Sequence, residues 1–599
     1  MGSCFASRFT RTSTRNKELT PFFIMDLGKY IRDGIAYLPD GLTEIGRNDF
    51  CLVSKSDLSG VHIPSSVLKI EEHAFSYFYK LEAIDIPDGV VEIGDEAFEE
   101  CCNLRHITIP SSVTEIGRNA FKNCSSLTEL IIPNGVRIIG EGAFYGCNRL
   151  KRVTISDSVT EIGDGAFERS GVERVVLSKN ITKIPNRLFY NCSSLATIKI
   201  PVKVKAIGDD AFRECRFSGL KRITIPKNVE YIGEGAFKDC ESLAKLVISD
   251  GVRTIKRSAF ESCWSLKTLE IPNSVTTIEE RAFSCCMGLI KLTIPESVSR
   301  IGDWAFSSCS GLLRIDMPST VTDFGSFVFS GCSSLPSFIV PKNWTIIQDG
   351  TFYGCKGLIY INLPKGVTRI GRSAFEKCTS LMRIEIPDSV TEIGWGAFSG
   401  CSSLTDVDLP YSVNHIDGHA FYECSKLERI IIPNGVKKIS DGLFFWSHIK
   451  SVDIPNSVQT IGSLAFGYSG IRGITIPNSV TTIERQAFER AHITSIKIPS
   501  SVQYIGEQAF RGSSLTTIEI DDVADHLRFE KELIFQCPIS KFILRIKDVS
   551  RAGVIVGGLC RGSYLKLQNI SIIVPPELFD DYSQNTVFAS FKEIVASDI

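Results

Sequence analysis

LRHITIPSSVTEIGRNAFKNCSS, residues 104–126, decides the fold of this chain, because the same pattern returns after 23 residues at Leu127 and then along most of the sequence. A fixed period between 20 and 50 residues predicts a solenoid. A unit this short cannot bury its apolar face alone, so neighbouring copies must stack and share one core. Further copies open at Leu58, Leu81, Leu150, Leu195, Leu220, Leu243, Leu266, Leu289, Leu312, Leu335, Leu358, Leu381, Leu404 and Leu427.

Each copy predicts its own local structure when positions are counted from the leading leucine. The alternating Leu-x-x-Ile-x-Ile predicts a short strand over positions 4–6, and the proline at position 7, such as Pro110, ends it because proline has no N–H to donate. Val at 10, Ile at 13 and Gly at 14, such as Gly117, predict a second extended piece closed by a tight bend. Ala-Phe at 17–18 and Cys at 21 predict one or two helical turns.

The expected fold is therefore an α/β-type repeat solenoid, a horseshoe or superhelix of about 21 repeats of about 23 residues, each with short β-strands and a short helix. We expect residues 1–34 to form a leader, disordered or an N-terminal cap, and residues 35–521 to form the solenoid. Residues 522–599 are expected to form irregular terminal repeats and a C-terminal cap, since an open solenoid end exposes core and strand edge. The stretch Gly553–Gly558 is expected to be a turn of this cap.

The pattern L-x-x-I-x-I-P-x-x-V-x-x-I-G-x-x-A-F-x-x-C-x-x resembles the signature of the BspA-like, or Treponema-type, leucine-rich repeat family over about residues 58–521. The resemblance implies a curved leucine-rich-repeat solenoid. It also implies a bacterial surface protein that acts as an adhesin for host matrix or cell-surface proteins. The C-terminal segment resembles the closing element of Bacteroidetes-type members, with a strand over 570–575, Tyr582 and a helix over 588–594.

Bulk properties exclude several classes of protein. The net charge of −2 and the isoelectric point near 6.5 argue against a nucleic-acid or polybasic membrane partner. No run of 18 apolar residues occurs, so no membrane-spanning segment is expected. The first 24 residues are basic and rich in Ser and Thr, without the apolar run of a secretory signal, and Met25 is a plausible alternative start.

The chain has 20 cysteines, most of them in one register. Because no C-x-x-C cluster occurs, we expect buried apolar thiols rather than metal ligands or disulfides. Unpaired thiols fit a cytoplasmic setting better than the cell-surface or secreted location that the resemblance implies, and both locations stay open. The cysteines at position 21 are Cys101, Cys124, Cys147, Cys192, Cys215, Cys240, Cys263, Cys286, Cys309, Cys332, Cys355, Cys378, Cys401 and Cys424.

No motif predicts catalysis. His415 and His419 straddle an expected bend rather than sharing one helix face, and the H-E-x-x-H zinc pattern is absent. The chain also lacks the phosphate-binding and nucleophile-elbow motifs, so we expect no enzyme, no cofactor and no metal. The irregular segment 527–567 is where an enzymatic alternative would have to place its site.

The expected function is protein binding through the strand surface. Positions 4 and 6 should point into the core, so positions 3 and 5 should face solvent. These positions carry many charges, which predicts either a solubilising ladder of ion pairs or a long docking face for an extended or polyvalent protein ligand. We expect an adhesin-like monomer, or alternatively an intracellular scaffold of the same fold. The candidate binding residues are Arg222, Lys245, Glu270, Lys291, Arg314, Asp316, Tyr360, Arg383, Glu385, Asp408 and Arg429.

Overall fold

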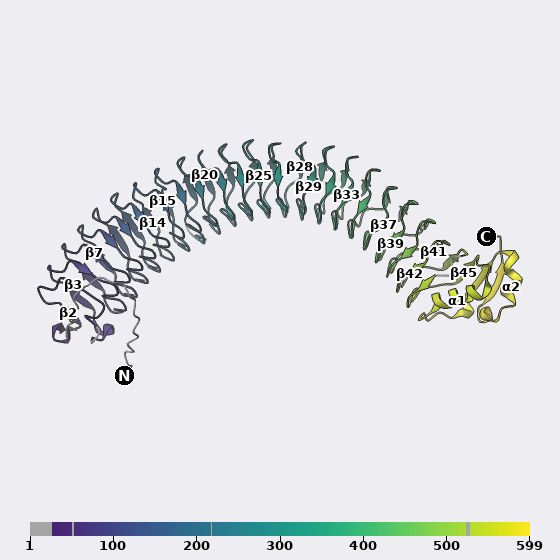
Figure 1. Cartoon of the computed structure of the whole chain (residues 1–599), viewed down its shortest axis with the longest axis horizontal. Coiled ribbons are helices and arrows are strands. Elements are labelled where there is room, and N and C mark those ends of the chain that lie inside the picture. Colours follow the sequence, from purple (N-terminus) through teal and green to yellow (C-terminus); the bar gives the residue numbers. More distant parts are fainter. Residues whose placement is uncertain (1–26, 51–52, 217–218, 523–526, 599) are drawn as a thin grey trace, which may run out of the picture.

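The chain forms a long arc of stacked turns (Figure 1). The structure, a computed structural model, describes residues 27–50, 53–216, 219–522 and 527–598. It contains about 24 turns of about 23 residues, somewhat more than the 21 repeats expected from the sequence. Most of the expected leader, residues 1–26, lies outside the described residues.

The expected first strand is present in every described repeat except the one that begins at Ile471. These strands form a parallel ladder, apart from the antiparallel pairing of β1 with β2 at the N-terminal end. The ladder is interrupted into several sheets along the arc. Its strands are β1 (Ile31–Arg32), β2 (Ile35–Tyr37), β4 (Gly60–His62), β6 (Ala83–Asp85), β8 (His106–Thr108), β10 (Glu129–Ile132), β12 (Arg152–Ile155), β14 (Arg174–Val176), β16 (Thr197–Ile198), β18 (Arg222–Ile225), β20 (Lys245–Ile248), β22 (Thr268–Glu270), β24 (Lys291–Thr293), β26 (Arg314–Asp316), β28 (Ser337–Ile339), β30 (Tyr360–Asn362), β32 (Arg383–Glu385), β34 (Asp406–Asp408), β36 (Arg429–Ile431), β38 (Ser451–Asp453), β41 (Ser495–Ile498), β43 (Thr517–Ile520), β45 (Lys541–Leu544), β46 (Ser571–Val574) and β47 (Glu593–Ala596).

The expected second extended piece is also present and forms a second parallel ladder of two-residue strands. These are β3 (Glu44–Ile45), β5 (Lys69–Ile70), β7 (Glu92–Ile93), β9 (Glu115–Ile116), β11 (Ile138–Ile139), β13 (Glu161–Ile162), β15 (Lys183–Ile184), β17 (Ala206–Ile207), β19 (Tyr231–Ile232), β21 (Thr254–Ile255), β23 (Thr277–Ile278), β25 (Arg300–Ile301), β27 (Asp323–Phe324), β29 (Ile346–Ile347), β31 (Arg369–Ile370), β33 (Glu392–Ile393), β35 (His415–Ile416), β37 (Lys438–Ile439), β39 (Thr460–Ile461), β40 (Thr482–Ile483), β42 (Tyr504–Ile505) and β44 (Arg528–Phe529).

The prediction of a short helix in each repeat is wrong, because positions 15–20 form a run of tight turns. Asn119 and Asn123, at positions 16 and 20, have φ of +53° and +59°, a left-handed conformation that an α-helix does not contain. The intervening Phe121 donates its N–H to the carbonyl of Ala143 in the next repeat at 2.7 Å. The turns therefore form a third line of hydrogen bonds between repeats, which a helix would have kept inside one repeat.

The glycine at position 14 permits close approach of neighbouring repeats. A Cβ atom on Gly117 would lie 2.5 Å from the backbone carbonyl carbon of Gly94 in the preceding repeat. Gly140 stands in the same relation to Gly117, again at 2.5 Å. The expected bend is present, but glycine is required there by contact with the adjacent backbone rather than by a positive φ.

The core consists of columns of identical residues. Phe121 stacks on Phe144 with ring centroids 5.3 Å apart and planes within 1° of parallel. The thiol of Cys147 donates to the carbonyl of Phe121 at 3.3 Å, and burial raises the pKa of this thiol to about 12. In the described part of the chain the column cysteines are buried, as expected from the sequence.

The C-terminal segment extends the first ladder and covers it with helices. Strands β45, β46 and β47 continue the parallel pairing, so the predicted helix over 588–594 is wrong: η5 (Thr586–Phe588) leads into β47. The Gly553–Gly558 stretch lies inside helix α1 (Val549–Cys560), not in a turn. Buried Tyr582 donates its hydroxyl to the carbonyl of Ile546 at 2.7 Å. The other helical elements are α2 (Phe579–Ser583), η1 (Leu27–Tyr30), η2 (Lys55–Asp57), η3 (Leu567–Asn569) and η4 (Pro576–Leu578). Among the described residues, no helix has the length and apolar character needed to cross a bilayer.

Candidate protein-binding face

The first strands present one long solvent-exposed surface, which we call the first-strand face and define as the side chains at positions 3 and 5 of every repeat. The strands alternate as predicted: in β32, Arg383 and Glu385 are exposed and Ile384 is buried. All eleven predicted binding residues lie on this face, and all are exposed except the half-buried Asp316. The structure thus places the predicted residues together along one surface.

In-register pairing sorts the charges of this face into columns. Lys291 in β24 lies directly beside Arg314 in β26, both at position 3. Glu385 in β32 lies beside Asp408 in β34, both at position 5. A column rich in basic side chains therefore runs next to a column rich in acidic side chains.

Ion pairs connect the two columns. The Nε of Arg314 lies 2.7 Å from Oδ1 of Asp316, and the Nζ of Lys291 lies 3.4 Å from Oδ2. The hydrogen bond from Arg314 and the two nearby cations lower the pKa of Asp316. Arg429 and Asp453 form a similar pair at 3.3 Å. Because these pairs are exposed, each contributes under about 1 kcal/mol to stability, which leaves their charges accessible to a partner.

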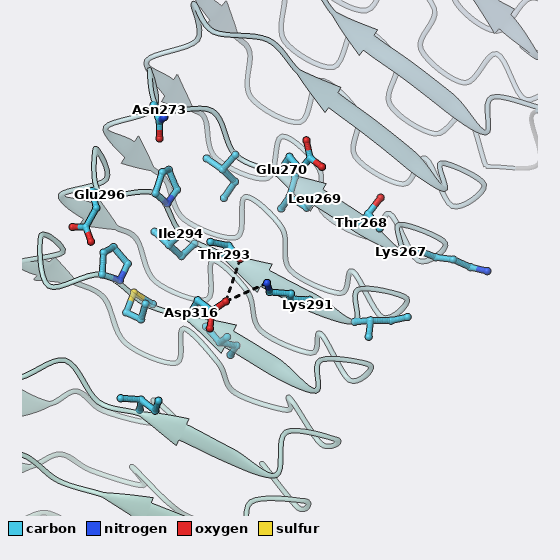
Figure 2. A pocket seen from close by; sticks show the side chains of 17 residues that line it. Lys267, Thr268, Leu269, Glu270, Asn273, Lys291, Thr293, Ile294, Glu296 and Asp316 are labelled. Carbon is cyan, nitrogen blue, oxygen red and sulfur yellow. Dashed lines mark hydrogen bonds and ion pairs between the residues drawn. The ribbon is translucent and has the colours of Figure 1, made fainter.

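A hollow of about 1170 Å³ lies on the first-strand face, mainly over three neighbouring repeats that begin at Leu266, Leu289 and Leu312, and reaches Ile339 of the next repeat. Figure 2 shows Lys267 at one end of the hollow, Asn273 and Glu296 at the other, and Lys291 and Asp316 linked between them. Apolar side chains also line it, namely Leu269, Ile271, Ile290, Ile294, Pro295, Ile315, Met317, Pro318 and Ile339. The hollow therefore combines an apolar floor with charged groups at both ends.

An apolar row beside this hollow was missed by the sequence analysis, which considered only positions 3 and 5. Position 2 is apolar in five consecutive repeats, and we call these residues the apolar row: Ile290, Leu313, Pro336, Ile359 and Met382. Backbone hydrogen bonds place its members side by side, since Leu313 N–H donates to Ile290 O at 2.9 Å and Ile359 N–H donates to Pro336 O at 3.0 Å.

The apolar row is well exposed. Ile290, Leu313, Ile359 and Met382 each expose between 50% and 54% of their surface. Ile339 on the adjoining first-strand face exposes 84%. The signal was present in the sequence, because position 2 is mostly polar elsewhere, as in Arg105, Thr128 and Lys151. A run of five apolar residues at one exposed position is typical of an interaction surface.

The comparisons with known proteins agree with this architecture. The family model for the BspA type leucine rich repeat region matches residues 36–128, 114–244, 230–359, 345–472 and 437–551. The chain belongs to this family.

Several solved structures are similar to this chain. A leucine-rich repeat protein from Bacteroides ovatus is 32% identical, with a TM-score of 0.41, covering 62% of this chain and 83% of its own. A leucine rich cell surface protein from Faecalibacterium prausnitzii is 33% identical, with a TM-score of 0.36, covering 53% of this chain and 82% of its own. The leucine-rich repeat protein of T. pallidum is 28% identical, with a TM-score of 0.25, covering 35% and 84%. No curated protein matches the chain.

Proposed function

We propose that this chain is a non-enzymatic protein-binding solenoid, an adhesin-like protein that docks host matrix or cell-surface proteins on its first-strand face. The apolar row carries the proposal. It supplies an exposed apolar strip alongside the charged first-strand face, and protein interfaces commonly combine a water-excluding apolar patch with polar surroundings.

The apolar row is expected to contribute more binding free energy than the charged side chains of the face. Burial of apolar surface contributes roughly 25 cal/mol per Å², whereas exposed ion pairs contribute little net energy. The basic and acidic columns beside the row set orientation and partner choice rather than affinity. The bound segment is therefore expected to lie along the row, with its own charges opposite Lys291, Arg314 and Asp316.

An extended, monomeric chain suits this role. The first-strand face continues on both sides of the apolar row, so a long or polyvalent protein ligand gains weaker contacts along neighbouring repeats. The proposed partner is protein and not nucleic acid, because acidic and basic side chains alternate on the face and the net charge is −2.

The buried cysteines are compatible with a surface location. Burial raises the pKa of Cys309 and Cys355 to about 12, which suppresses the reactive thiolate. Oxidation requires an accessible thiolate, so these thiols survive in an oxidising medium while the solenoid stays folded. The apparent conflict between many thiols and an adhesin's location is thus removed by burial.

Surface plasmon resonance against a panel of matrix and cell-surface proteins tests the proposal. Leu313→Asp places a charge in the middle of the apolar row and is expected to weaken any specific interaction at least tenfold. Thr128→Asp makes the same change at the same position of a repeat without the row and serves as the matched control. Equal loss in both variants, or no binding to any protein of the panel, would reject the proposal.

The alternative is an intracellular scaffold that uses the same face. The many column cysteines favour it, because reduced thiols are typical of a cytoplasmic setting. Protease shaving of intact native cells, with mass spectrometry of the released peptides, separates the two. Peptides from residues 58–521 in the shaved fraction support the adhesin, and their confinement to the soluble lysate supports the scaffold.

A further inference from the structure

A histidine and two glutamates converge on the turn side of the second and third repeats, away from the first-strand face. His73 and Glu96 occupy position 16 of adjacent repeats, and Glu99 lies at position 19 beside them. One ligand atom from each residue lies within 4.8 Å of the other two. Sequence analysis missed this group because its members belong to different repeats and only the repeat register brings them together.

The surroundings of Glu99 differ from those of the other buried glutamates at position 19 of their repeats. Position 19 is also a buried glutamate at Glu168 and Glu489. There the carboxylate has donors nearby: Arg187 lies 2.8 Å from Glu168, and Gln486, at position 16, donates to Glu489 at 2.8 Å. In the repeat of Glu99, position 16 is instead a second acid, Glu96.

The negative charge of Glu99 is partly compensated by a lysine. The Nζ of Lys122 lies 2.9 Å from Oε1 of Glu99. One ammonium nevertheless faces two carboxylates, Glu96 and Glu99, and the nearby Glu100 adds a third. The cluster therefore carries excess negative charge with a histidine at its centre.

The imidazole of His73 is held as a metal-binding histidine is held. Its Nδ1 lies 3.0 Å from Oε2 of Glu96, and its Nε2 lies 3.2 Å from Oε1 of Glu72. Histidines that bind a metal through one ring nitrogen commonly donate the other N–H to a carboxylate, which fixes the ring. Glu72 is placed to accept this hydrogen bond, while Nδ1 lies beside Oε2 of Glu96.

An acidic hollow of about 400 Å³ lies next to the cluster, and its lining includes Glu72, which contacts His73. Its carboxylates outnumber its single cation, Lys69, and they come from Glu71, Glu72, Glu92, Asp95 and Glu115. Such a field concentrates cations near the cluster.

We propose that His73, Glu96 and Glu99 bind one divalent transition-metal ion of the Zn²⁺ or Mn²⁺ class, with Glu72 orienting the imidazole. A ligand set of one imidazole nitrogen and two carboxylates suits Zn²⁺ or Mn²⁺ better than it suits Ca²⁺, because Ca²⁺ prefers six or more oxygen ligands. With metal–ligand distances of about 2.0–2.2 Å, ligand atoms of a tetrahedral site lie roughly 3.4 Å apart, so small side-chain movements complete the site. The ion would join the second repeat to the third and stabilise the N-terminal end of the solenoid.

Isothermal titration of the metal-free full chain with Zn²⁺ tests the proposal. One site per chain is expected, with binding lost in His73→Ala and weakened 10- to 100-fold in Glu72→Gln. Lys122→Met is expected to tighten binding, because it removes the ammonium that competes for Glu99. His419→Ala is the matched control, since His419 also occupies position 16 but its ring faces Trp395 and Tyr422 instead of acids.

Co²⁺ substitution checks the ligands independently of affinity. Visible absorption without a thiolate-to-cobalt charge-transfer band is expected, whereas such a band would assign the ion to a cysteine such as Cys102. A thermal melt of each variant without metal confirms that it folds. Absence of stoichiometric binding, equal loss in His419→Ala, or a thiolate band would overturn the proposal and leave a histidine paired with two acids.

Discussion

The central repeats, residues 289–403, and the N-terminal repeats, residues 104–171, share one interior and differ on their surface. Phe121 stacks on Phe144 at 5.3 Å, and Phe375 stacks on Phe398 at 5.5 Å, so the two regions bury the same column. Position 2 is polar in the N-terminal repeats and forms the apolar row in the central repeats. The repeat pattern thus determines the fold, and departures at exposed positions distinguish the candidate binding region.

The interior of the central repeats also departs from the usual pattern. Phe324 and Trp344 replace the usual Ile and Val, and their rings pack at 4.2 Å. The stack loosens there, with Phe306 and Phe329 6.1 Å apart and 21° from parallel. The indole N–H of Trp344 is buried without a hydrogen-bond partner. The central repeats therefore combine an altered core with an altered surface.

The largest expected effect is loss of a core ring. Phe306→Ala should lower the free energy of unfolding by about 3–5 kcal/mol, because it removes a fully buried ring that stacks on its neighbour. Phe121→Ala should cost a similar amount in the N-terminal repeats. Urea unfolding followed by circular dichroism measures both, and a cost under about 1 kcal/mol in either region would contradict the shared-column account.

A smaller effect is expected for a cysteine of the column. Cys309→Ser should cost about 1 kcal/mol, since a buried hydroxyl replaces an apolar thiol but can still find a carbonyl. Ser447 shows this solution, since its hydroxyl donates to the carbonyl of Phe444 in its own repeat at 2.7 Å. The thiol of Cys309 instead donates to Phe283 of the preceding repeat at 3.3 Å. A loss as large as that of Phe306→Ala in the same urea titration would show that the thiol contact between repeats is essential.

The reactivity of the thiols is expected to differ between the buried cysteines of the column and the partly exposed cysteines outside it. At neutral pH the column cysteines of both regions, such as Cys147 and Cys309, should resist alkylation, because burial raises each pKa to about 12. The partly exposed Cys102 and Cys285 should react first. Mass spectrometry after brief iodoacetamide treatment measures this order, and rapid labelling of Cys147 or Cys309 would show that the column opens.

The smallest effect is expected on the first-strand face. Arg314→Ala should change the free energy of unfolding by under about 1 kcal/mol, because its pair with Asp316 is exposed. The pKa of Asp316 is lowered in the folded chain. The pair's contribution is therefore present above the unfolded pKa of about 3.9 and lost as the pH falls through the folded value. Thermal melts from pH 7 to pH 3 test this, with Lys497→Ala as a comparison. A large destabilisation at pH 7 would mean that the face is structural.

The sequence predicted the repeat, both strands and the inward and outward positions, because apolar periodicity and proline placement act locally. The expected helix failed at positions 16 and 20, where asparagine and glycine recur, as in Asn119, Asn123, Gly142 and Gly146. These residues favour positive φ and signalled turns. The His73 cluster could not be found by local motifs, because its residues meet only through stacking of repeats.

Site-specific photo-crosslinking tests the central claim most directly. A photoreactive amino acid replaces Leu313 in the apolar row or, as the matched control, Thr128 at the same position of the N-terminal repeats. After irradiation with the matrix or cell-surface proteins of the binding panel, we predict a specific protein adduct from position 313 and none from position 128. Equal adducts at both positions, or none at position 313 while binding persists, would contradict a central binding face.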